Sequence, residues 1–545
     1  MAPIIIATDK TQLTQFSGNK AAYPVYLTIG NIPKATRRKP SKHACVLIAY
    51  LSVEKINRSR MNDQEHRSRV QRIFHESMRI VLEPLIHAST NGIEMTSSDG
   101  AVQCVYPILT CYVADYPEQC LVACTKYGTC VKCQASAKDL QNPTPADNRT
   151  QKWTEEIISK GMEEANGNAR KFHTYCMSND VAGSVYKPFW VGFPFVDIHR
   201  AITPDVLHQL YQGVFKHIVS WCQRILTPQE LDRRIRALPP AYGLRQFKNG
   251  IFALSQISGP ERKNMAKILL GCLVGSMPSG GIAAITALLD FIYIAQYPAH
   301  DTITLGYLKD SLDRFHKNRT YFITTFVRED FNIPKFHSLL HYIEAIEFFG
   351  TTDNYNTEMF ERLHIDFAKH GWRASNQCDE FPQMIRWLSR QEKIAGFEAH
   401  LPQPQLVNNP DDSHKKKKLQ ISIAKKPSFS GRPLSLIEEK HLVPDFTYYL
   451  KVFLDSLLDK PMQNRFLNNS SLPFTKVDVY NMFRFHPDGI QDNDEENDLV
   501  RALPKSAQNP HGRFDTVIAF LSNKDSESTG VAGELSIDFK DKPLS

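Results

Sequence analysis

The chain has 545 residues, enough for about two to four domains, and its 42% hydrophobic and 23% charged residues are typical of a globular protein rather than a disordered one. The formal net charge of +7 permits a nucleic-acid partner without requiring one. The 11 cysteines are an odd number in a long chain with no secretory signal, so we expect a reduced, intracellular protein without a disulfide framework.

Residues 1–133 alternate short β-rich runs with stretches of helical spacing. The run over residues 3–8 is apolar and rich in isoleucine, which predicts a buried strand, and turn-forming residues separate it from the runs that follow. The predicted elements in order are strands over 3–8, 23–28 and 44–52, a helix over 64–88, a strand over 105–114 and a helix over 118–125. This is the element order of a ribonuclease-H-like core in an α/β fold.

Two acids directly follow predicted strands, Asp9 after the first and Asp115 after the fourth. In the ribonuclease-H-like order these strands lie side by side, so their terminal carboxylates would converge. Each acid also has a structural interpretation, because Asp9 could begin a turn and Asp115 could cap the helix that Pro117 begins.

The middle of the chain, residues 134–330, has a polar start and then mostly helical spacing, which predicts a large helical insertion in the core. The predicted helices cover 206–222, 229–238, 265–274, 283–297 and 305–330. The most apolar stretch, 268–295, contains Pro278 and Asp290, so we expect core helices and no membrane span. Residues 331–400 would close the core, with helices over 357–370 and 383–395.

Residues 401–432 are rich in Pro, Asn, Ser and Lys and predict a basic linker. Its lysine runs at 415–418 and 425–426 are either a nuclear-import signal or solvated linker charge. Residues 433–545 predict a small α+β unit. Its expected features are a helix over 446–458, an acidic loop over 492–498 and a strand over 514–520.

Two pairs of residues have the spacing of zinc ligands. Cys130 and Cys133 form a C-x-x-C knuckle whose thiolates can share one tetrahedral ion, which needs two more ligands. His337 and His341 stand one helical turn apart and could supply them, although such a pair is also common in a core or on a surface. The substitutes for a histidine that does not take part are Cys124, Cys176 and His173.

The first helix of the closing segment carries a further set of polar residues. Glu358, Glu361 and His364 follow one another at intervals of three, so they share a helix face. Glu361 could complete a carboxylate trio with Asp9 and Asp115. Such a trio requires divalent cations, because neighbouring carboxylates repel one another. The alternative is a solvated helix face paired with neighbouring basic residues.

Long strings of the sequence resemble the transposases of Plavaka-type elements in basidiomycete fungi, which are similar to the Kyakuja–Dileera–Zisupton and CACTA-like cut-and-paste transposases. The strings include YPILTCYVADYPEQCLVAC, TPDVLHQLYQGVFKH, FNIPKFHSLLHYIEAI and YNTEMFERLHIDFAKHGWRASN. The resemblance covers residues 1–400, and the C-terminal unit also resembles the tail of these proteins.

The resemblance implies a DDE transposase whose ribonuclease-H-like core is interrupted by a helical insertion. The three acids of the family pattern fall on Asp9, Asp115 and Glu361, which would hold Mg²⁺ or Mn²⁺. Asp205 is the rival of Asp115 for the second position, and Glu358 is the rival of Glu361 for the third.

Supporting residues follow from the same resemblance. Related superfamilies have a C-x-x-C soon after the second acid and paired histidines before the glutamate, which matches the four zinc ligands named above and makes that zinc structural. Their D-x-x-H signature fits Asp205 and His208. His364, three residues after Glu361, is a further supporting residue.

The implied activity is metal-dependent cleavage of DNA strands at transposon ends, followed by strand transfer into target DNA in the nucleus. The implied partners are double-stranded DNA, as transposon ends and as target, and other copies of the chain in a homo-oligomer. Basic segments 37–42 and 233–236 are candidate phosphate contacts, with ordinary surface charge as the alternative. Family members carry a long region with DNA-binding zinc fingers before the first strand, whereas this sequence begins at that strand. The alternative function is therefore a truncated, inactive transposase relic that retains the fold and DNA binding.

Overall fold

The computed structural model of the chain divides into two compact units, Met1–Leu401 and Pro402–Ser545. In the first unit it describes residues 1–400 except 15–18, 58, 60, 98 and 242–243. In the second unit it describes residues 420–423, 426–441, 444–456, 465–469, 471–486, 498–503 and 513–514. No helix among these residues has both the length and the apolar character needed to cross a bilayer.

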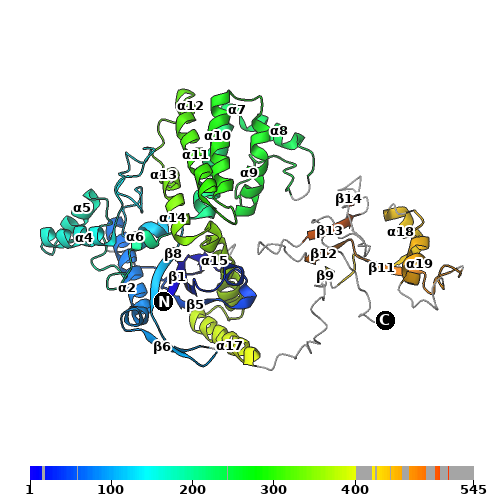
Figure 1. Cartoon of the computed structure of the whole chain (residues 1–545), viewed down its shortest axis with the longest axis horizontal. Coiled ribbons are helices and arrows are strands. Elements are labelled where there is room, and N and C mark those ends of the chain that lie inside the picture. The colour runs from blue at the N-terminus through cyan, green and yellow to red at the C-terminus, as the bar shows by residue number, and fades with distance from the viewer. Residues whose placement is uncertain are drawn as a thin grey trace. The chain divides into compact units, whose positions relative to one another are not determined.

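The first unit contains a four-stranded mixed sheet (Figure 1). Its strands are β1 (Ala2–Thr8), β4 (Pro24–Ile29), β5 (Cys45–Tyr50) and β8 (Pro107–Val113), in the order β5-β4-β1-β8. β1 is antiparallel to β4 and parallel to β8. Because β1 and β8 run in the same direction, Asp9 and Asp115 emerge at the same edge of the sheet. The predicted α/β class is confirmed as a mixed α/β fold with a small mixed sheet.

Strand β1 is buried on both faces, which explains its continuous apolar sequence. Ile4 and Ile6 pack in a core with residues of helix α2 (Asp63–Asn91). Ile5 packs on the opposite face, in a core with residues of helix α15 (Thr357–Leu363). Full burial of one isoleucine side chain contributes about 1.5–3 kcal/mol, so these contacts fix the end of β1 firmly.

Helix α2 begins with a capping box, in which Asn62 and Glu65 each accept a hydrogen bond from the other's backbone N–H. Its buried residues Phe74, Met78 and Leu82 recur at intervals of four and form the helix face toward the sheet. This periodicity is what predicted the helix, which extends a few residues further at its C-terminal end than expected.

Two short hairpins are absent from the sequence-based prediction. They are β2 (Thr11–Gln12) with β3 (Ala21–Ala22), and β6 (Ile93–Thr96) with β7 (Val102–Val105). Strands of two to four residues show too little periodicity to be recognised. The remaining short helices of this part are α1 (Lys34–Arg37), the 3-10 helix η1 (Pro40–Lys42) and α3 (Tyr116–Val122).

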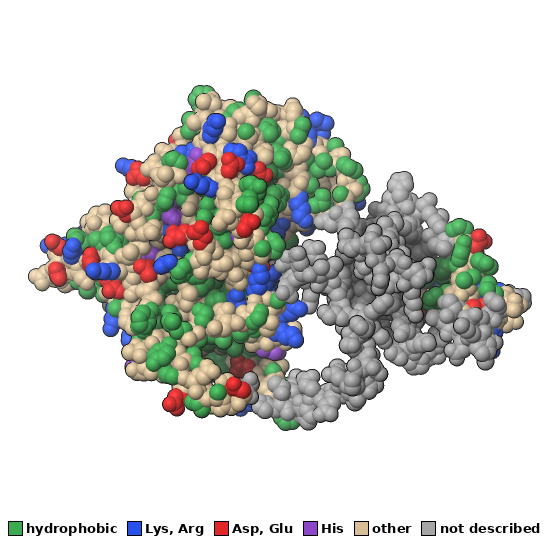
Figure 2. Space-filling model, in the orientation of Figure 1, with side chains coloured by type: hydrophobic (Ala, Val, Ile, Leu, Met, Phe, Trp, Pro, Cys, Tyr) green, Lys and Arg blue, Asp and Glu red, His purple; other side chains and the backbone are tan. Residues whose placement is uncertain are grey.

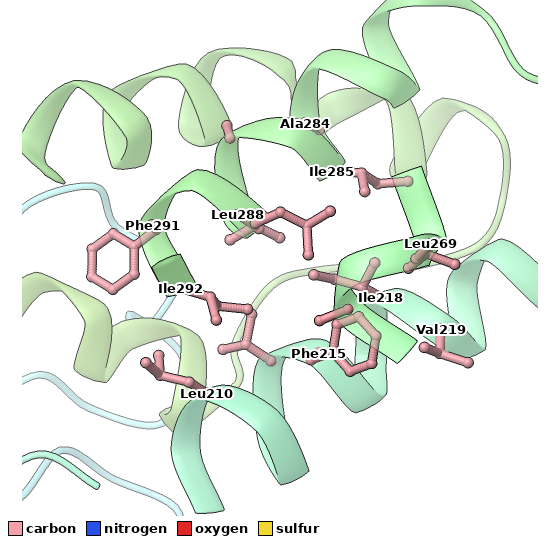
Figure 3. Packing of buried hydrophobic residues seen from close by; sticks show 14 of the residues in the cluster. Leu210, Phe215, Ile218, Val219, Leu269, Ala284, Ile285, Leu288, Phe291 and Ile292 are labelled. Carbon is pink, nitrogen blue, oxygen red and sulfur yellow. The ribbon is translucent and has the colours of Figure 1, made fainter. Parts of the chain in front are cut away.

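The middle of the chain is mainly helical. Its helices are α4 (Gln151–Ala165), α5 (Ala169–Ser178), α6 (Ile198–Ala201), the π-helix η2 (Val206–Phe215), α7 (Lys216–Leu226), α8 (Pro228–Ala237), α9 (Gly259–Leu273), α10 (Ser279–Ile294), α11 (Thr302–Asn318) and α12 (Thr320–Thr324). From η2 onward they share one hydrophobic core, in which Leu210, Phe215 and Ile218 face Leu269 and Leu288 (Figure 3).

That core continues beyond residue 330, where the insertion was predicted to end. Helices α13 (Pro334–His337), η3 (Ser338–His341) and α14 (Tyr342–Phe349) follow. Phe336, Leu339, Tyr342 and Ile346 belong to the same buried cluster as the insertion helices. By its packing, the helical part therefore includes the segment that carries the two predicted zinc-ligand histidines.

The closing segment contains η4 (Thr352–Asn354), α15, the π-helix η5 (His364–Lys369), α16 (His370–Arg373) and α17 (Glu380–His400). The helix predicted over 357–370 is thus divided into α15, η5 and α16, whereas α17 contains the helix predicted over 383–395. The helix predicted over 206–222 likewise begins as the π-helix η2. π-Helical segments are rare and are frequently found at functional sites, and hydrophobic spacing does not distinguish them from α-helix.

The described part of the second unit contains both helices and strands. Its elements are β9 (Gln420–Ile423), β10 (Phe429–Pro433), α18 (Leu434–His441), α19 (Phe446–Ser456), β11 (Lys476–Val479), β12 (Met482–His486), β13 (Asp498–Leu503) and β14 (Arg513–Phe514). β9 and all but the last residue of β10 fall within the stretch predicted as a linker, 401–432. The lysine run at 415–418, the acidic loop up to residue 497 and residues 515–520 lie outside the described residues.

Charged side chains of both signs are interspersed over the face of the first unit that Figure 2 shows. This agrees with the modest net charge of +7. Broad electrostatic attraction therefore does not by itself locate a functional surface, and the arrangement of individual side chains has to do so.

Candidate functional site

Three acids predicted from the sequence line one cavity of the first unit. Asp9 follows β1, Asp115 follows β8 and Glu361 lies on α15, and His208 of η2 is the basic residue of the lining. The rest of the lining consists of Ala7, Thr8, Val113, Ala114, Thr357 and Phe360. We call Asp9, Asp115 and Glu361 the cavity carboxylates. They come from three distant parts of the sequence, so only the folded core brings them together.

Asp9 is bonded to a histidine of the π-helical segment η5. His364 Nε2 lies 3.1 Å from Asp9 Oδ2, and His364 Nδ1 lies 2.9 Å from the hydroxyl oxygen of Tyr26. A carboxylate accepts hydrogen bonds, so Nε2 donates to Asp9. Nδ1 accepts from the Tyr26 hydroxyl when the imidazole is neutral and donates to it when the imidazole is charged. Tyr26 and His364 are buried, whereas 42% of the Asp9 side chain is exposed.

Asp115 caps helix α3, which is one of the two roles considered for it, and it also lines the cavity. Its Oδ1 accepts a 3.0 Å hydrogen bond from the backbone N–H of Glu118. Burial raises the pKa of Asp115. The capping hydrogen bond and the charge of His208 oppose this rise, and the charges of Asp9 and Asp205 add to it.

A second histidine, His208, connects Asp205 to Glu361. Its Nδ1 lies 2.6 Å from Asp205 Oδ2, and its Nε2 lies 3.3 Å from Glu361 Oε1. Burial alone would lower the pKa of His208, but the hydrogen bond and charge of Asp205, with the charges of Glu361 and Asp115, raise it to about 9. Burial also raises the pKa of Glu361 to about 7, against the opposing charge of His208. His208 is therefore a cation between two acids at neutral pH.

The surroundings of Glu358 distinguish it from its rival Glu361. Glu358 forms a 2.7 Å ion pair with Lys263 of α9, and its backbone N–H donates to the side chain of Asn356. Glu361, one helical turn later, lines the cavity. Glu361 is thus the glutamate of α15 that shares the cavity with Asp9 and Asp115.

Asp205 differs from Asp115 in burial and in its bonds. It is only 1% exposed, and its carboxylate caps η2 by accepting from the backbone N–H groups of Leu207 and His208. It also accepts a 2.7 Å hydrogen bond from the Thr357 hydroxyl. Asp205 is therefore engaged inside the protein, and Asp115 is the acid of this pair that faces the cavity.

Glu118 is a half-buried acid that was not among the site residues predicted from the sequence. Its Oε1 accepts hydrogen bonds from the hydroxyl of Thr8, at 2.6 Å, and from the hydroxyl of Tyr23. Burial raises the pKa of Glu118 to about 7 despite these two hydrogen bonds. Its position three residues after the helix cap Asp115 is the one signal in the sequence, and that signal indicates only support of the first helical turn.

The four predicted zinc ligands come together as one buried group. Cys130 Sγ lies 3.3 Å from His341 Nε2, and Cys133 Sγ lies 3.1 Å from His337 Nε2. All four ligand atoms lie within 4.8 Å of one another. Two thiols and two imidazoles at these distances fit one tetrahedral zinc ion. We call these residues the Cys2His2 group.

Groups around the Cys2His2 group orient its members. His337 Nδ1 lies 3.0 Å from the carbonyl oxygen of Leu140, so its Nε2 is left for a metal. The buried Arg149 donates through Nε to the carbonyl oxygens of Cys130 and Cys133, at 2.9 and 3.0 Å. Burial lowers the pKa of His341, which keeps this imidazole neutral as a ligand must be.

The thiols of the knuckle have different acidities. The hydrogen bond from Cys130, followed by those from His337 and His341, lowers the pKa of Cys133, whereas burial raises the pKa of Cys130. The three substitutes considered from the sequence lie elsewhere. Cys124 contacts His75, and His173 bonds the carbonyl oxygen of Gly183. Cys176 is buried in a separate hydrophobic cluster with Ile158 and Phe172.

Among the described residues, the Cys2His2 group is the one set of three or more His, Cys, Asp or Glu side chains whose ligand atoms are close enough to hold an ion. The cavity carboxylates face one space without surrounding a single ion position. Carboxylate oxygens are the donors that Mg²⁺ and Mn²⁺ prefer, so the chemistry of the donor set fits such an ion.

The basic segments considered as phosphate contacts are engaged within the protein. Arg37 is buried, and its guanidinium donates to the carbonyl oxygens of Ile32 and Asn354. In the second segment, Arg233 and Arg234 both form 2.7 Å ion pairs with Glu230. The structure therefore favours structural roles for these arginines.

Comparison with known families gives one match. Residues 1–222 match the family described as Plavaka transposase. The resemblance noted from the sequence is confirmed over this span, which contains Asp9, Asp115, both cysteines of the Cys2His2 group and the D-x-x-H residues. A search of curated proteins found no match.

Proposed function

We propose that this chain, whose residues 1–222 match the Plavaka transposase family, is the catalytic part of a DDE transposase, which cuts DNA strands and joins the freed 3′-hydroxyl to target DNA. The observation that carries the proposal is the shared cavity of Asp9, Asp115 and Glu361. Asp9 and Asp115 follow adjacent parallel strands, and Glu361 comes from helix α15, which packs on one face of these strands. A ribonuclease-H-like core has acids in this arrangement.

Asp9, Asp115 and Glu361 are the residues that would hold Mg²⁺ or Mn²⁺. Bound cations of this kind lower the pKa of an attacking water or hydroxyl and stabilise the leaving oxygen of a phosphodiester. Glu361 would exchange its contact with His208 for the cation, while Asp205 and Thr357 keep His208 in place. Asp115 would contribute the oxygen that does not cap helix α3.

The Cys2His2 group has a structural role in this proposal. Zinc bound there would join the knuckle that follows α3 to the helical segment that precedes α14. Asp115 caps α3, so the position of this acid would depend on that connection. Structural zinc sites of this composition contribute directly to folding.

DNA is the macromolecular partner that membership of a transposase family implies. We further propose that the chain acts on double-stranded transposon ends and target DNA in the nucleus, as a homo-oligomer, because joining two ends to one target requires more than one active site. The nuclear expectation is tested by imaging the tagged chain with and without the lysines at 415–418.

The test of the activity is cleavage of supercoiled DNA by the purified chain with Mg²⁺ or Mn²⁺. We expect nicked product, and we expect Asp9→Asn and Glu361→Gln each to lower the rate by more than about 100-fold, because each removes a charged cation ligand. Glu358→Gln is the matched control, since it changes the same group one turn away outside the cavity, and it should cleave like the wild type.

Two results would overturn the proposal. Equal cleavage by the wild type and by Asp9→Asn would show that a contaminating nuclease or another site is responsible. Absence of cleavage by a folded, zinc-loaded chain under all cation conditions would support the inactive-relic alternative.

A further inference from the structure

Asp9 stands at the end of a chain of hydrogen bonds that begins in the sheet. The Tyr26 hydroxyl, His364 Nδ1, His364 Nε2 and Asp9 Oδ2 follow one another at 2.9 and 3.1 Å. A carboxylate accepts hydrogen bonds, so His364 Nε2 donates to Asp9. A neutral imidazole accepts from the Tyr26 hydroxyl at Nδ1 and an imidazolium donates to it, so in either state both ring nitrogens of His364 are bonded and the ring is held in one orientation.

The first two members of this chain are held rigidly. Tyr26 lies in β4 directly opposite Ala7 of β1, two residues before Asp9. The Tyr26 ring packs on Phe360 and Phe367, with ring centroids 6.3 and 5.8 Å away. Tyr26 is fully buried and His364 is 4% exposed. The sheet and the surrounding core therefore hold these two side chains in place.

Asp9 itself lacks such packing. Its side chain is 42% exposed at the end of a strand, where an aspartate would normally rotate freely. Within the part of the chain that the structure describes, Oδ2 is the Asp9 oxygen with a hydrogen-bond partner, which leaves Oδ1 for a ligand in the cavity. Holding one oxygen removes most of the rotational freedom that a metal would otherwise have to restrict.

We propose that Tyr26 and His364 form a relay that fixes the orientation of Asp9, which makes His364 a positioning residue for the divalent cation of the cavity. This inference rests on the proposed function, because it assigns Asp9 as a cation ligand. It adds a specific role for the π-helical segment η5, whose first residue is His364. The relay acts through Asp9, and neither Tyr26 nor His364 touches the reacting atoms.

The test is Mn²⁺ binding to the full-length, zinc-loaded chain without DNA, measured by the electron paramagnetic resonance signal of free Mn²⁺. We expect Asp9→Asn to abolish the binding that depends on the cavity. We expect His364→Gln to weaken Mn²⁺ binding by about 10-fold or more, the effect typical of removing a group that orients a metal ligand. Tyr26→Phe should weaken it in the same direction by a smaller factor, because the imidazole stays but loses the hydrogen bond that orients its ring.

Tyr50→Phe is the matched control. The Tyr50 hydroxyl donates a 2.6 Å hydrogen bond to the backbone carbonyl of Phe367, on the same segment η5, but it does not connect to Asp9. Both tyrosines come from neighbouring strands of the sheet, so the two variants remove the same atom from similar surroundings. Tyr50→Phe should bind Mn²⁺ like the wild type.

The outcomes separate this inference from the proposed function. If Asp9→Asn abolishes binding while His364→Gln and Tyr26→Phe bind like the wild type, the relay is wrong and the cavity site stands. If Tyr50→Phe weakens binding as much as Tyr26→Phe, general packing explains the effect and the relay is also wrong. If the wild type binds no more Mn²⁺ than Asp9→Asn, both proposals fail. Should His364→Gln not fold, Tyr26→Phe and its control decide the question.

Discussion

The Cys2His2 group and the cavity carboxylates are organised in opposite ways. In the Cys2His2 group, four buried ligand atoms from two distant segments already lie within 4.8 Å of one another. In the cavity, Asp9 and Glu361 each contact a histidine instead, and Asp115 caps a helix. One centre is assembled by the fold alone, whereas in the other each acid is held separately.

The charge of the ligands explains this difference. Thiols and neutral imidazoles do not repel one another, so the chain can gather them without an ion. Carboxylates at the same distances would repel, and they can come together only when a cation neutralises them. Before a cation binds, His208 is the partner of Glu361 and His364 is the partner of Asp9. We therefore expect the first centre to govern stability and the second to govern chemistry.

The largest expected effect comes from removing both thiols of the Cys2His2 group. Cys130→Ser with Cys133→Ser should reduce the zinc content to near zero and destabilise the first unit by about 5 kcal/mol or more, because structural zinc contributes strongly to folding. Zinc is measured by mass spectrometry and stability by urea unfolding. Cys104→Ser changes an exposed thiol and should leave both unchanged. Undiminished zinc in the double variant would refute the assignment.

A smaller effect is expected from the arginine that supports the knuckle. Arg149→Met removes the donor shared by the carbonyl oxygens of Cys130 and Cys133 and should cost about 3 kcal/mol, since it leaves buried acceptors without their charged partner. Zinc affinity should fall as well, measured by competition with a chelator. Lys126→Met, which removes an ion pair with Asp180 nearby, serves as the control. Unchanged zinc affinity in Arg149→Met would contradict this support role.

The first unit should become less stable in acid because of His75, a buried residue of helix α2. Burial lowers the pKa of His75 to about 4, and its Nδ1 accepts a hydrogen bond from the backbone N–H of Phe189. The unfolded chain takes up this proton near pH 6.5 and the folded chain does not, so stability is lost as the pH falls from about 6.5 towards 4. At pH 5 the loss from this residue should be about 2 kcal/mol.

This pH dependence is measured by urea unfolding at pH 7.5 and pH 5. His75→Gln has no titrating group, so its stability should change less between the two pH values than that of the wild type. The same change in both proteins would show that other groups, including the two centres themselves, account for the acid sensitivity.

The smallest expected effect concerns the support of the cavity. Thr357→Val removes the buried 2.7 Å hydrogen bond to Asp205 and should cost about 1–2 kcal/mol. Because Asp205 holds His208, DNA cleavage should fall while zinc content stays constant. Thr351→Val is the control for losing a nearby hydroxyl. The Thr351 hydroxyl accepts a hydrogen bond from Lys34 and donates one to Asp353. A loss of zinc in Thr357→Val would contradict the separate roles of the two centres.

Much of the candidate site is predictable because its residues follow local patterns. Asp9 and Asp115 come directly after apolar runs, and the C-x-x-C and H-x-x-x-H spacings single out the members of the Cys2His2 group as candidates, whereas only the fold excludes the substitutes. The choice between Glu358 and Glu361 is different, because both lie on the same helix face. A tertiary contact, the ion pair of Glu358 with Lys263, separates them, and no local pattern contains that information.

The supporting residues are the least predictable part. Arg149 acts through carbonyl oxygens of another loop, and Tyr26 reaches a histidine 338 positions away in the sequence. Such bonds depend on packing across the whole core. The π-helical segments that present His208 and His364 have the same hydrophobic spacing as α-helices, so the sequence predicts helices there without the local widening.

The contact between Cys133 and His337 spans 204 positions of the chain. A metal ion bound there would close almost the whole helical insertion into a loop whose two ends are joined at the core. The entropy of closing a loop grows only with the logarithm of its length, so doubling such a loop costs only about 0.6 kcal/mol. The length of an insertion closed in this way therefore has little effect on the cost of closing it. An ion at the base of the loop would hold the two ends of the insertion together at the core whatever the length of the chain between them.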